Sequence, residues 1–192
     1  MPRRPKSPLP DLLPETPAAN GPDHVQSFAP RLGRRCRVLI LGSMPGARSL
    51  AAGQYYAHPQ NQFWPTMQAV FGVDAALPYE RRIAGLQACG VGLWDVLHGC
   101  ERRGSLDSAI TAESEVPNAI ADLLAQRCDI AVLAFNGAKA AQAFRRHVAA
   151  QIAPSRLAAL SLRALPSTSP AHASMSRDEK LRRWSILAAP AG

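Results

Sequence analysis

Five consecutive residues, Gly42-Ser43-Met44-Pro45-Gly46, follow a short apolar run and combine two glycines with a proline. This composition favours a tight turn, because glycine accepts backbone angles that other residues avoid and proline fixes its own. Such a turn leaves backbone amides exposed, and exposed amides can bind an oxygen-rich ligand. The segment is therefore a candidate ligand-binding turn.

The segment at residues 54–64 is rich in aromatic and amide side chains. It reads Gln-Tyr-Tyr-Ala-His-Pro-Gln-Asn-Gln-Phe-Trp and holds four aromatic residues, in a chain that is only 6% aromatic. This concentration indicates either a functional loop or a surface loop that is pinned by a few aromatic side chains in the core. The residues themselves leave both interpretations open.

A third segment, residues 165–173, reads Leu-Pro-Ser-Thr-Ser-Pro-Ala-His-Ala and places three hydroxyl groups between prolines. Hydroxyl groups and free backbone amides are good phosphate contacts. The alternative is an ordinary Ser/Pro loop that leads into a helix.

The elements that must position these segments follow from the apolar pattern. Short apolar runs predict buried parallel strands at residues 38–41, 91–94, 130–135 and 160–165. Helices are expected at residues 63–71, 79–89, 116–127 and 138–150, and from Ser176 onward. Pro117 suits the first turn of the third helix, and the last helix opens with the capping-box pattern Ser176-Arg177-Asp178-Glu179.

Strands that alternate with helices favour an α/β fold, with a four-stranded parallel sheet between two layers of helices. Ligands bind such sheets at the carboxyl ends of the strands. The segments at 42–46 and 165–173 both follow strands, so we expect them at the same edge of the sheet. Residues 36–192 are expected to form a single domain. Residues 1–35 hold 8 of the 17 prolines and show no hydrophobic period, which predicts a flexible basic tail.

The 22 Lys and Arg residues outnumber the 14 Asp and Glu residues, so the chain carries a net charge of +8. A polyanionic partner suits this charge, although a general bias toward arginine would produce it without any function. No apolar run is long enough for a membrane span or a signal peptide, so we expect a soluble cytoplasmic protein with no membrane partner. The four cysteines form no CxxC pair, which argues against a zinc site or a disulfide framework.

These motifs resemble, in order and spacing, those of the uracil-DNA glycosylase superfamily. The resemblance rests on residues 42–46, on His58-Pro59-Gln60-Asn61-Gln62-Phe63-Trp64 and on residues 165–170. Residues 54–56, 92–97 and 104–107 make the chain most similar to the hypoxanthine-DNA glycosylase branch. The aromatic segment is also similar to the mismatch-specific uracil and thymine glycosylases, which share an HPxNxFW pattern. The similarity extends from residue 37 to about residue 184.

The resemblance implies a three-layer α/β/α fold around a four-stranded parallel sheet. It also implies a monomeric enzyme that acts, without metal or redox cofactor, on a deaminated base flipped out of single- or double-stranded DNA. Carried over by position, the base-binding residues are Ser43, Met44, Tyr56, Phe63 and Asn136, with Tyr56 stacking on the base. The DNA-binding residues are Gly46, Ser167, Thr168, Ser169, Pro170, Ala171 and His172.

The chain departs from the mismatch-specific relatives at Met44, where they carry a catalytic asparagine. A methionine can neither orient water nor stabilise a cation, so that function must lie elsewhere or be missing. Asn61 is the candidate, because it matches the position to which the hypoxanthine branch assigns catalysis, and its amide could hold a water molecule against the sugar. The alternative is that Asn61 only caps the helix that begins near Phe63.

Asp95 follows a predicted strand, where it could act as a base, align Asn61 or simply cap the next turn. The three lysines, Lys6, Lys139 and Lys180, lie outside the two motif loops, which predicts a monofunctional glycosylase without a Schiff-base nucleophile. We expect it to excise hypoxanthine from deoxyinosine in base-excision repair. The alternatives are a uracil- or mismatch-specific glycosylase of the same superfamily and a non-catalytic lesion-binding protein, the latter suggested by Met44.

Overall fold

The computed structural model describes residues 23–188, and its centre is a four-stranded parallel sheet. The strands are β2 (Val38–Gly42), β3 (Val91–Asp95), β6 (Val132–Asn136) and β7 (Ser161–Leu165), in the spatial order β3-β2-β6-β7. Every residue of β2, β3 and β6 is buried, as expected for strands covered on both faces, whereas β7 is more exposed at the edge. The predicted three-layer α/β/α fold is confirmed.

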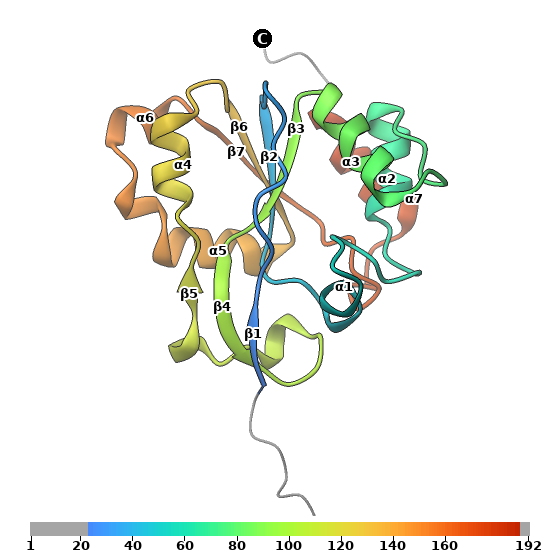
Figure 1. Cartoon of the computed structure of the whole chain (residues 1–192), viewed down its shortest axis with the longest axis horizontal. Coiled ribbons are helices and arrows are strands. Elements are labelled where there is room, and N and C mark those ends of the chain that lie inside the picture. The colour runs from blue at the N-terminus through green and yellow to red at the C-terminus, as the bar shows by residue number, and fades with distance from the viewer. Residues whose placement is uncertain (1–22, 189–192) are drawn as a thin grey trace, which may run out of the picture.

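Helices cover both faces of this sheet (Figure 1). On one face lie α2 (Phe63–Phe71), α3 (Tyr79–Ala88) and α7 (Arg177–Trp184). On the other lie α4 (Ile120–Gln126), α5 (Ala138–His147) and α6 (Pro154–Ala158). Because side chains alternate along a strand, Leu39 and Leu41 pack with the α4 and α5 side, while Val38 and Ile40 pack with the α2, α3 and α7 side. The short helix α1 (Ala47–Ala52) follows β2.

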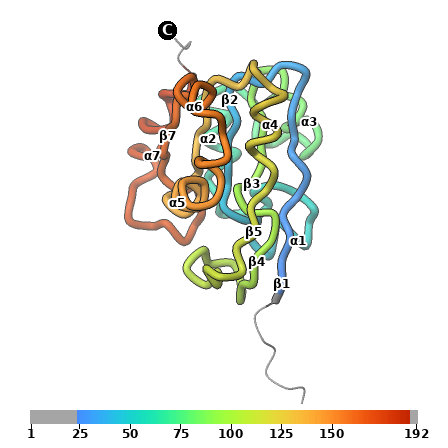
Figure 2. Tube along the Cα trace, turned by 90° about the vertical axis from the view of Figure 1, so that its left-hand side faces the viewer, coloured from blue at the N-terminus to red at the C-terminus, as the bar shows by residue number. Residues whose placement is uncertain are grey.

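A second, antiparallel sheet continues directly from the first. It contains β1 (Asp23–Gln26), β4 (Leu97–Arg102) and β5 (Val116–Pro117), in the order β1-β4-β5. Only Val96 separates β3 from β4, so the chain passes from one sheet into the other almost without interruption. Figures 1 and 2 show the second sheet below the parallel sheet, at the end where the parallel strands finish.

The predicted flexible tail is wrong for residues 23–35. β1 pairs with β4 from Asp23 opposite Arg102 to Gln26 opposite Gly99, and Arg31 forms an isolated bridge with Leu93. These contacts are long-range in sequence, which is why a local hydrophobic period does not show them. Residues 1–22 of the predicted tail lie outside the described residues.

The helix predicted at 116–127 begins later than expected. Val116 and Pro117 form β5 against β4, and the helix starts at Ile120. Pro117 therefore lies in a short edge strand, a place where its missing N–H costs little. The predicted cap of the last helix is correct, because the Ser176 hydroxyl accepts a hydrogen bond from the Glu179 N–H at 3.2 Å. Within residues 23–188, no helix combines the length and apolar character needed to cross a bilayer.

Candidate active site

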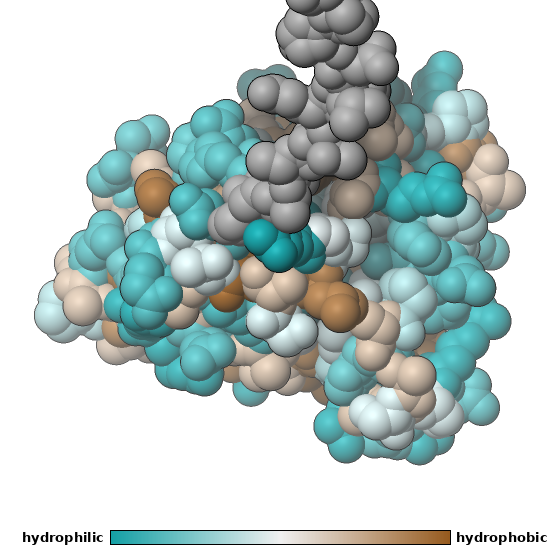
Figure 3. Space-filling view, turned by 90° about the horizontal axis from the view of Figure 1, so that it is seen from below, coloured by the Kyte–Doolittle hydropathy of each residue, from teal (hydrophilic) through white to brown (hydrophobic). Residues whose placement is uncertain are grey.

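A cavity of about 900 Å³ opens at the carboxyl ends of the parallel strands. Its walls come from the ends of β2, β3 and β6 and from four loops, at residues 43–49, 55–61, 105–108 and 167–172. Figure 3 views the molecule from this end, where hydrophilic residues surround a few hydrophobic ones. The predicted site residues that line the cavity are Ser43, Met44, Gly46, Tyr56, Asn61, Asn136, Ser167, Thr168, Ser169, Pro170, Ala171 and His172.

Phe63 does not line the cavity, although a base contact was predicted for it. Its side chain is fully buried and stacks on Tyr56, with ring centroids 3.7 Å apart and an angle of 17° between the planes. Phe63 is the first residue of α2, so its backbone is fixed by the helix and its ring holds Tyr56 in place. Among the described residues other than glycine, only Tyr56 has a positive φ, 57°, a conformation that costs energy and turns its ring toward the cavity wall.

Asn61 lines the cavity and also bonds the first N–H of α2, from the position before the N-cap residue Gln62. Its Oδ1 atom accepts a hydrogen bond from the Phe63 N–H at 2.9 Å, and its own backbone N–H donates to the His58 carbonyl at 2.8 Å. The two predicted roles, catalysis and capping, are therefore compatible in space. The amide nitrogen has no hydrogen-bond partner among residues 23–188, which leaves a donor at the cavity wall.

The turn at 42–46 is fixed by Arg102 on β4 and by Asp107 in the loop that follows β4. Ser43 donates a hydrogen bond from its hydroxyl group to Asp107 Oδ1 at 2.7 Å, and Arg102 donates to the Pro45 carbonyl at 2.6 Å. Met44 is 6% exposed and belongs to the apolar cluster on the α4 and α5 side of the sheet. Its side chain thus serves mainly as core packing where the mismatch-specific relatives carry an amide.

Asp95 is the most buried carboxylate of the site, with 3% of its surface exposed. Burial and the nearby negative charge of Asp107 raise its pKa to about 8, while the positive charge of Arg102 opposes the shift. The Oδ2 atom of Asp95 and the hydroxyl of Tyr56 are both buried without a hydrogen-bond partner among the described residues. Burial also raises the pKa of Tyr56, which keeps that hydroxyl neutral.

Asn136 links β6 to the loop at 167–172 through two hydrogen bonds. Its Nδ2 donates to the Thr168 hydroxyl and its Oδ1 accepts from the Thr168 N–H, both at 2.9 Å. The Thr168 carbonyl in turn accepts from the Gln62 N–H at 3.0 Å, which links this loop to the start of α2. Because Thr168 already engages both ends of the Asn136 amide, the structure favours a supporting role over the predicted base contact.

Several polar residues of the cavity, among them Ser105, Asp107 and Lys139, were not predicted as site residues. Ser105 and Asp107 come from the loop after β4, and Ser105 accepts a hydrogen bond from the Ala47 N–H at 2.9 Å. Lys139 lies at the cavity edge through its place near the start of α5, only three residues after Asn136. The predicted site residue Asn136 was the available signal for Lys139, whereas Ser105 and Asp107 depend on how the second sheet folds.

The ammonium group of Lys139 is paired with the buried carboxylate of Glu115, which also bonds His147 Nε2 at 2.6 Å. Burial alone would raise the pKa of Glu115, but hydrogen bonds from Lys139 and His147 outweigh it, and the pKa is lowered. Glu115 therefore stays charged and keeps its ion pair with Lys139. Across residues 23–188, no group of three or more His, Cys, Asp or Glu side chains is arranged to hold a metal ion.

Comparison with known proteins gives matches over most of the chain. The sequence profile described as the uracil DNA glycosylase superfamily matches residues 30–188. Two curated proteins named hypoxanthine DNA glycosylase are similar to the chain, one from Methanosarcina barkeri at 34% identity and one from Methanosarcina acetivorans at 33%. Each alignment spans 118 residues, which is 61% of this chain and 73% of the relative.

A solved structure is also similar. It is the solution NMR structure of a candidate uracil DNA glycosylase from Methanosarcina acetivorans, with a TM-score of 0.72 and 28% sequence identity. The match covers 86% of this chain and 97% of the other. The likeness therefore extends to the whole arrangement of elements that surrounds the cavity.

Proposed function

The chain belongs to the uracil DNA glycosylase superfamily, and on this premise we propose that it is a monofunctional DNA glycosylase that releases a deaminated base, preferentially hypoxanthine, from DNA. The observation that carries the proposal is the single cavity at the carboxyl ends of the strands, which gathers Tyr56, Asn61 and the loop at 167–172. The two relatives named hypoxanthine DNA glycosylase support this choice of base.

The reaction requires a base that has left the duplex. Flipping a nucleotide costs a few kcal/mol, and stacking of the base on Tyr56 offsets part of that cost. Phe63 keeps the Tyr56 ring in its position before the base arrives. In this proposal the hydroxyl groups of Ser167 and Ser169 contact phosphates on either side of the flipped nucleotide, whereas Thr168, which is buried and bonded to Asn136, supports the loop.

Hydrolysis breaks the bond between the sugar C1′ and the base nitrogen. The electron pair of that bond stays on the base, while a water oxygen forms the new bond to C1′ and the water proton is released. In this scheme Asn61 orients the water, and the phosphates of the DNA stabilise the positive charge that develops on the sugar. Backbone amides of the turn at 42–46 donate to the base oxygen, and each well-aimed donor contributes roughly 3 kcal/mol in the transition state.

The monofunctional mechanism agrees with the contacts of the cavity lysine. A Schiff-base nucleophile must reach the sugar carbon with its amine, but Lys139 Nζ is engaged by the Glu115 carboxylate. We expect borohydride to trap no covalent adduct between the protein and DNA. A trapped adduct that disappears in Lys139→Gln would show instead that Lys139 is a nucleophile.

The partner is DNA that contains a deaminated base, and we expect a monomer in the cytoplasm. Light scattering of the purified protein with and without a lesion-containing duplex tests the monomer directly. A dimer in either sample would contradict it.

The decisive test is an excision panel. Duplex and single-stranded oligonucleotides that carry inosine, uracil, xanthine or a thymine mismatch are incubated with the protein and then treated with alkali, which cleaves at abasic sites. We expect inosine to be the fastest substrate. A faster reaction on uracil or a mismatch would change the assigned substrate, and tight lesion binding without any cleavage would establish a non-catalytic binding protein.

A further inference from the structure

The carboxyl group of Asp95 lies beside the end of β2, at a position where β2 has a glycine and therefore no side chain. In the parallel register, Gly42 at the end of β2 lies opposite Asp95 at the end of β3. A Cβ atom on Gly42 would lie 2.3 Å from Asp95 Oδ1, a distance at which the two cannot coexist. The glycine therefore creates the space that the Asp95 carboxyl group fills, at the floor of the cavity.

The polar groups around Asp95 differ in whether they have hydrogen-bond partners. Ser43 is bonded to Asp107, and Asn136 is bonded twice to Thr168. By contrast, Asp95 Oδ2 and the Tyr56 hydroxyl are buried without a partner among the described residues. A buried polar atom without a partner costs about 1–3 kcal/mol, so a bound ligand that supplies the partner gains that energy back.

The charges that face Asp95 favour a neutral carboxyl group. Burial and the negative charge of Asp107 raise the pKa of Asp95, and they outweigh the Tyr55 hydroxyl, whose hydrogen bond lowers it. Arg102 is the opposing cation, but it donates to the carbonyls of Pro45 and Gly104, so it is not committed to Asp95. Lys139 is committed to Glu115. With a pKa of about 8, Asp95 carries its proton at neutral pH.

We propose that Asp95 binds the flipped base as a neutral acid, donating a hydrogen bond from its carboxyl O–H to the carbonyl oxygen of the base. This inference rests on the proposed function and identifies the group that recognises a deaminated base. Deamination replaces an amino group by a carbonyl, and a carbonyl oxygen accepts the hydrogen bond. As the bond to C1′ breaks, negative charge grows on that oxygen and the hydrogen bond strengthens. An ionised Asp95 would instead repel the oxygen.

The test is the pH dependence of single-turnover excision from an inosine duplex, between pH 6 and pH 9.5. Three proteins are compared: the parent, Asp95→Asn, which keeps a donor but cannot ionise, and Asp95→Ala, which has no donor. We expect the ratio of the Asp95→Asn rate to the parent rate to rise about tenfold between pH 7 and pH 9, as the parent loses its proton. Ionisation of the substrate itself is common to both proteins, so it cancels in this ratio. Asp95→Ala is expected to lose at least about tenfold in rate at pH 7, provided that circular dichroism shows it folded.

A neighbouring substitution provides a second measurement. Asp107→Asn removes the negative charge that faces Asp95, so the pH at which the rate declines is expected to move to a lower value. NMR titration of the Asp95 carboxyl carbon follows the same ionisation without any reaction. A ratio that stays constant with pH, or an Asp95→Asn protein that is inactive while the parent gains rate with pH, would overturn the proposal.

The two proposals fail in different ways. If the parent excises no deaminated base, the proposed function fails. The role of Asp95 is then judged on binding of the inosine duplex, which it requires to weaken above pH 8 in the parent and not in Asp95→Asn. If the parent is active but shows neither pH effect, only the role of Asp95 fails.

Discussion

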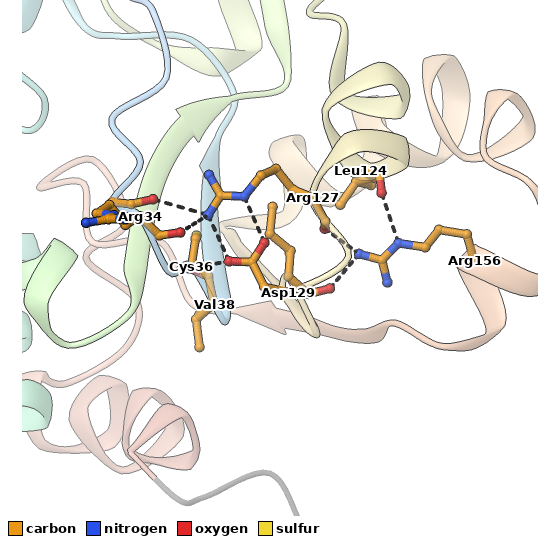
Figure 4. Close-up of polar contacts among 9 residues, drawn as sticks. Arg34, Cys36, Val38, Leu124, Arg127, Asp129 and Arg156 are labelled. Carbon is orange, nitrogen blue, oxygen red and sulfur yellow. Dashed lines mark hydrogen bonds and ion pairs between the residues drawn. The ribbon is translucent and has the colours of Figure 1, made fainter.

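The polar groups at the two ends of the parallel sheet differ in their hydrogen bonding. At the carboxyl end, Tyr56, Asp95 and Arg102 each keep a buried polar atom that has no partner among the described residues. At the amino end, two arginines and an aspartate near the starts of β2 and β6 are each hydrogen-bonded to the backbone (Figure 4). Buried polar atoms thus lack partners at the carboxyl end of the sheet, whereas the charged groups at the amino end are bonded to the backbone.

Figure 4 shows how the amino end is closed. Asp129 accepts from the Cys36 N–H at 2.7 Å and from Arg127 at 2.8 Å, and Arg127 also reaches the carbonyls of Gly33 and Arg34. Arg156 donates to the carbonyls of Leu124, Arg127 and Ile130. The guanidinium of Arg127 holds the pKa of Asp129 well below its usual range. Burial of the Cys36 thiol beside this network raises its pKa to about 11, so it stays protonated.

This difference in hydrogen bonding separates residues that stabilise the fold from residues that are available to bind a ligand. Charged groups at the amino end bond backbone carbonyls and amides, which is a structural use of charge. Polar groups at the carboxyl end keep atoms without partners, which costs stability that is recovered only when a ligand binds. Substitutions at the two ends should therefore change different measurable quantities.

The largest effect that we expect is on the pH dependence of stability at the carboxyl end. The folded pKa of Asp95, about 8, lies above the ordinary value of 3.8, so the favourable contribution is complete below pH 4 and is lost as the pH rises through 8. Between pH 5 and pH 8.5, the parent should lose a few kcal/mol in unfolding free energy relative to Asp95→Asn, on the order of 1.4 kcal/mol per pKa unit. Urea denaturation of both proteins at the two pH values measures this difference. Parallel behaviour of the two proteins would show that Asp95 is not protonated in the fold.

The next effect concerns Asn61. Asn61→Ala is expected to lower single-turnover excision by at least about tenfold and to leave the affinity for lesion DNA nearly unchanged, because the group acts mainly in the transition state. Asn61→Ser keeps an oxygen that can cap the Phe63 N–H but has no amide, so it should regain stability and not rate. A folded Asn61→Ala protein that excises at the parent rate would rule out a catalytic role. Recovery of the full rate in Asn61→Ser would reduce the role to capping.

At the amino end, a stability change without a catalytic change is expected. Asp129→Ala leaves the Cys36 N–H and Arg127 without their partner and should lower the unfolding free energy by about 1–2 kcal/mol. The matched control is Asp122→Ala on the exposed side of α4, which should have little effect. Denaturation and single-turnover assays are run on both proteins. A fall in the excision rate of folded Asp129→Ala would mean that the two ends are coupled.

The smallest effect is expected from removing residues 1–22. They carry three basic and two acidic side chains, a net charge of +1 out of +8 for the chain. The slope of log affinity against log salt should therefore change by less than about 1 in magnitude when they are deleted. A decrease of 2 or more would show that this segment neutralises several phosphates.

The parallel sheet could be predicted closely because its information is local. The segments at 38–41 and 91–94 are continuous apolar runs that end one residue before the observed strands do, and the helix at 63–71 has the observed bounds. The antiparallel sheet could not be predicted in this way. β4 contains His98, Glu101 and Arg102, and it becomes a strand only because β1 and β5 pair with it from distant positions.

The candidate site shows the same division. The motif segments identified most of the cavity wall, because two of them follow strands and the carboxyl ends of parallel strands meet at one edge. Phe63 was misplaced because its spacing from Tyr56 does not reveal that one ring lies under the other. Asp107 was missed as a site residue because it reaches Ser43 only through the loop that follows β4.

The pairing of β1 with β4 has a practical consequence for making shortened forms of the protein. A chain cut at residue 36 would lack β1 and would also lose the carbonyl of Phe28, which accepts a hydrogen bond from the Trp94 indole, and the hydroxyl of Ser27, which accepts one from Asn118. One edge of β4 would then present unpaired N–H and C=O groups to other molecules, the usual starting point for edge-to-edge aggregation. Shortened forms of the protein should therefore begin before Asp23, so that this edge stays covered.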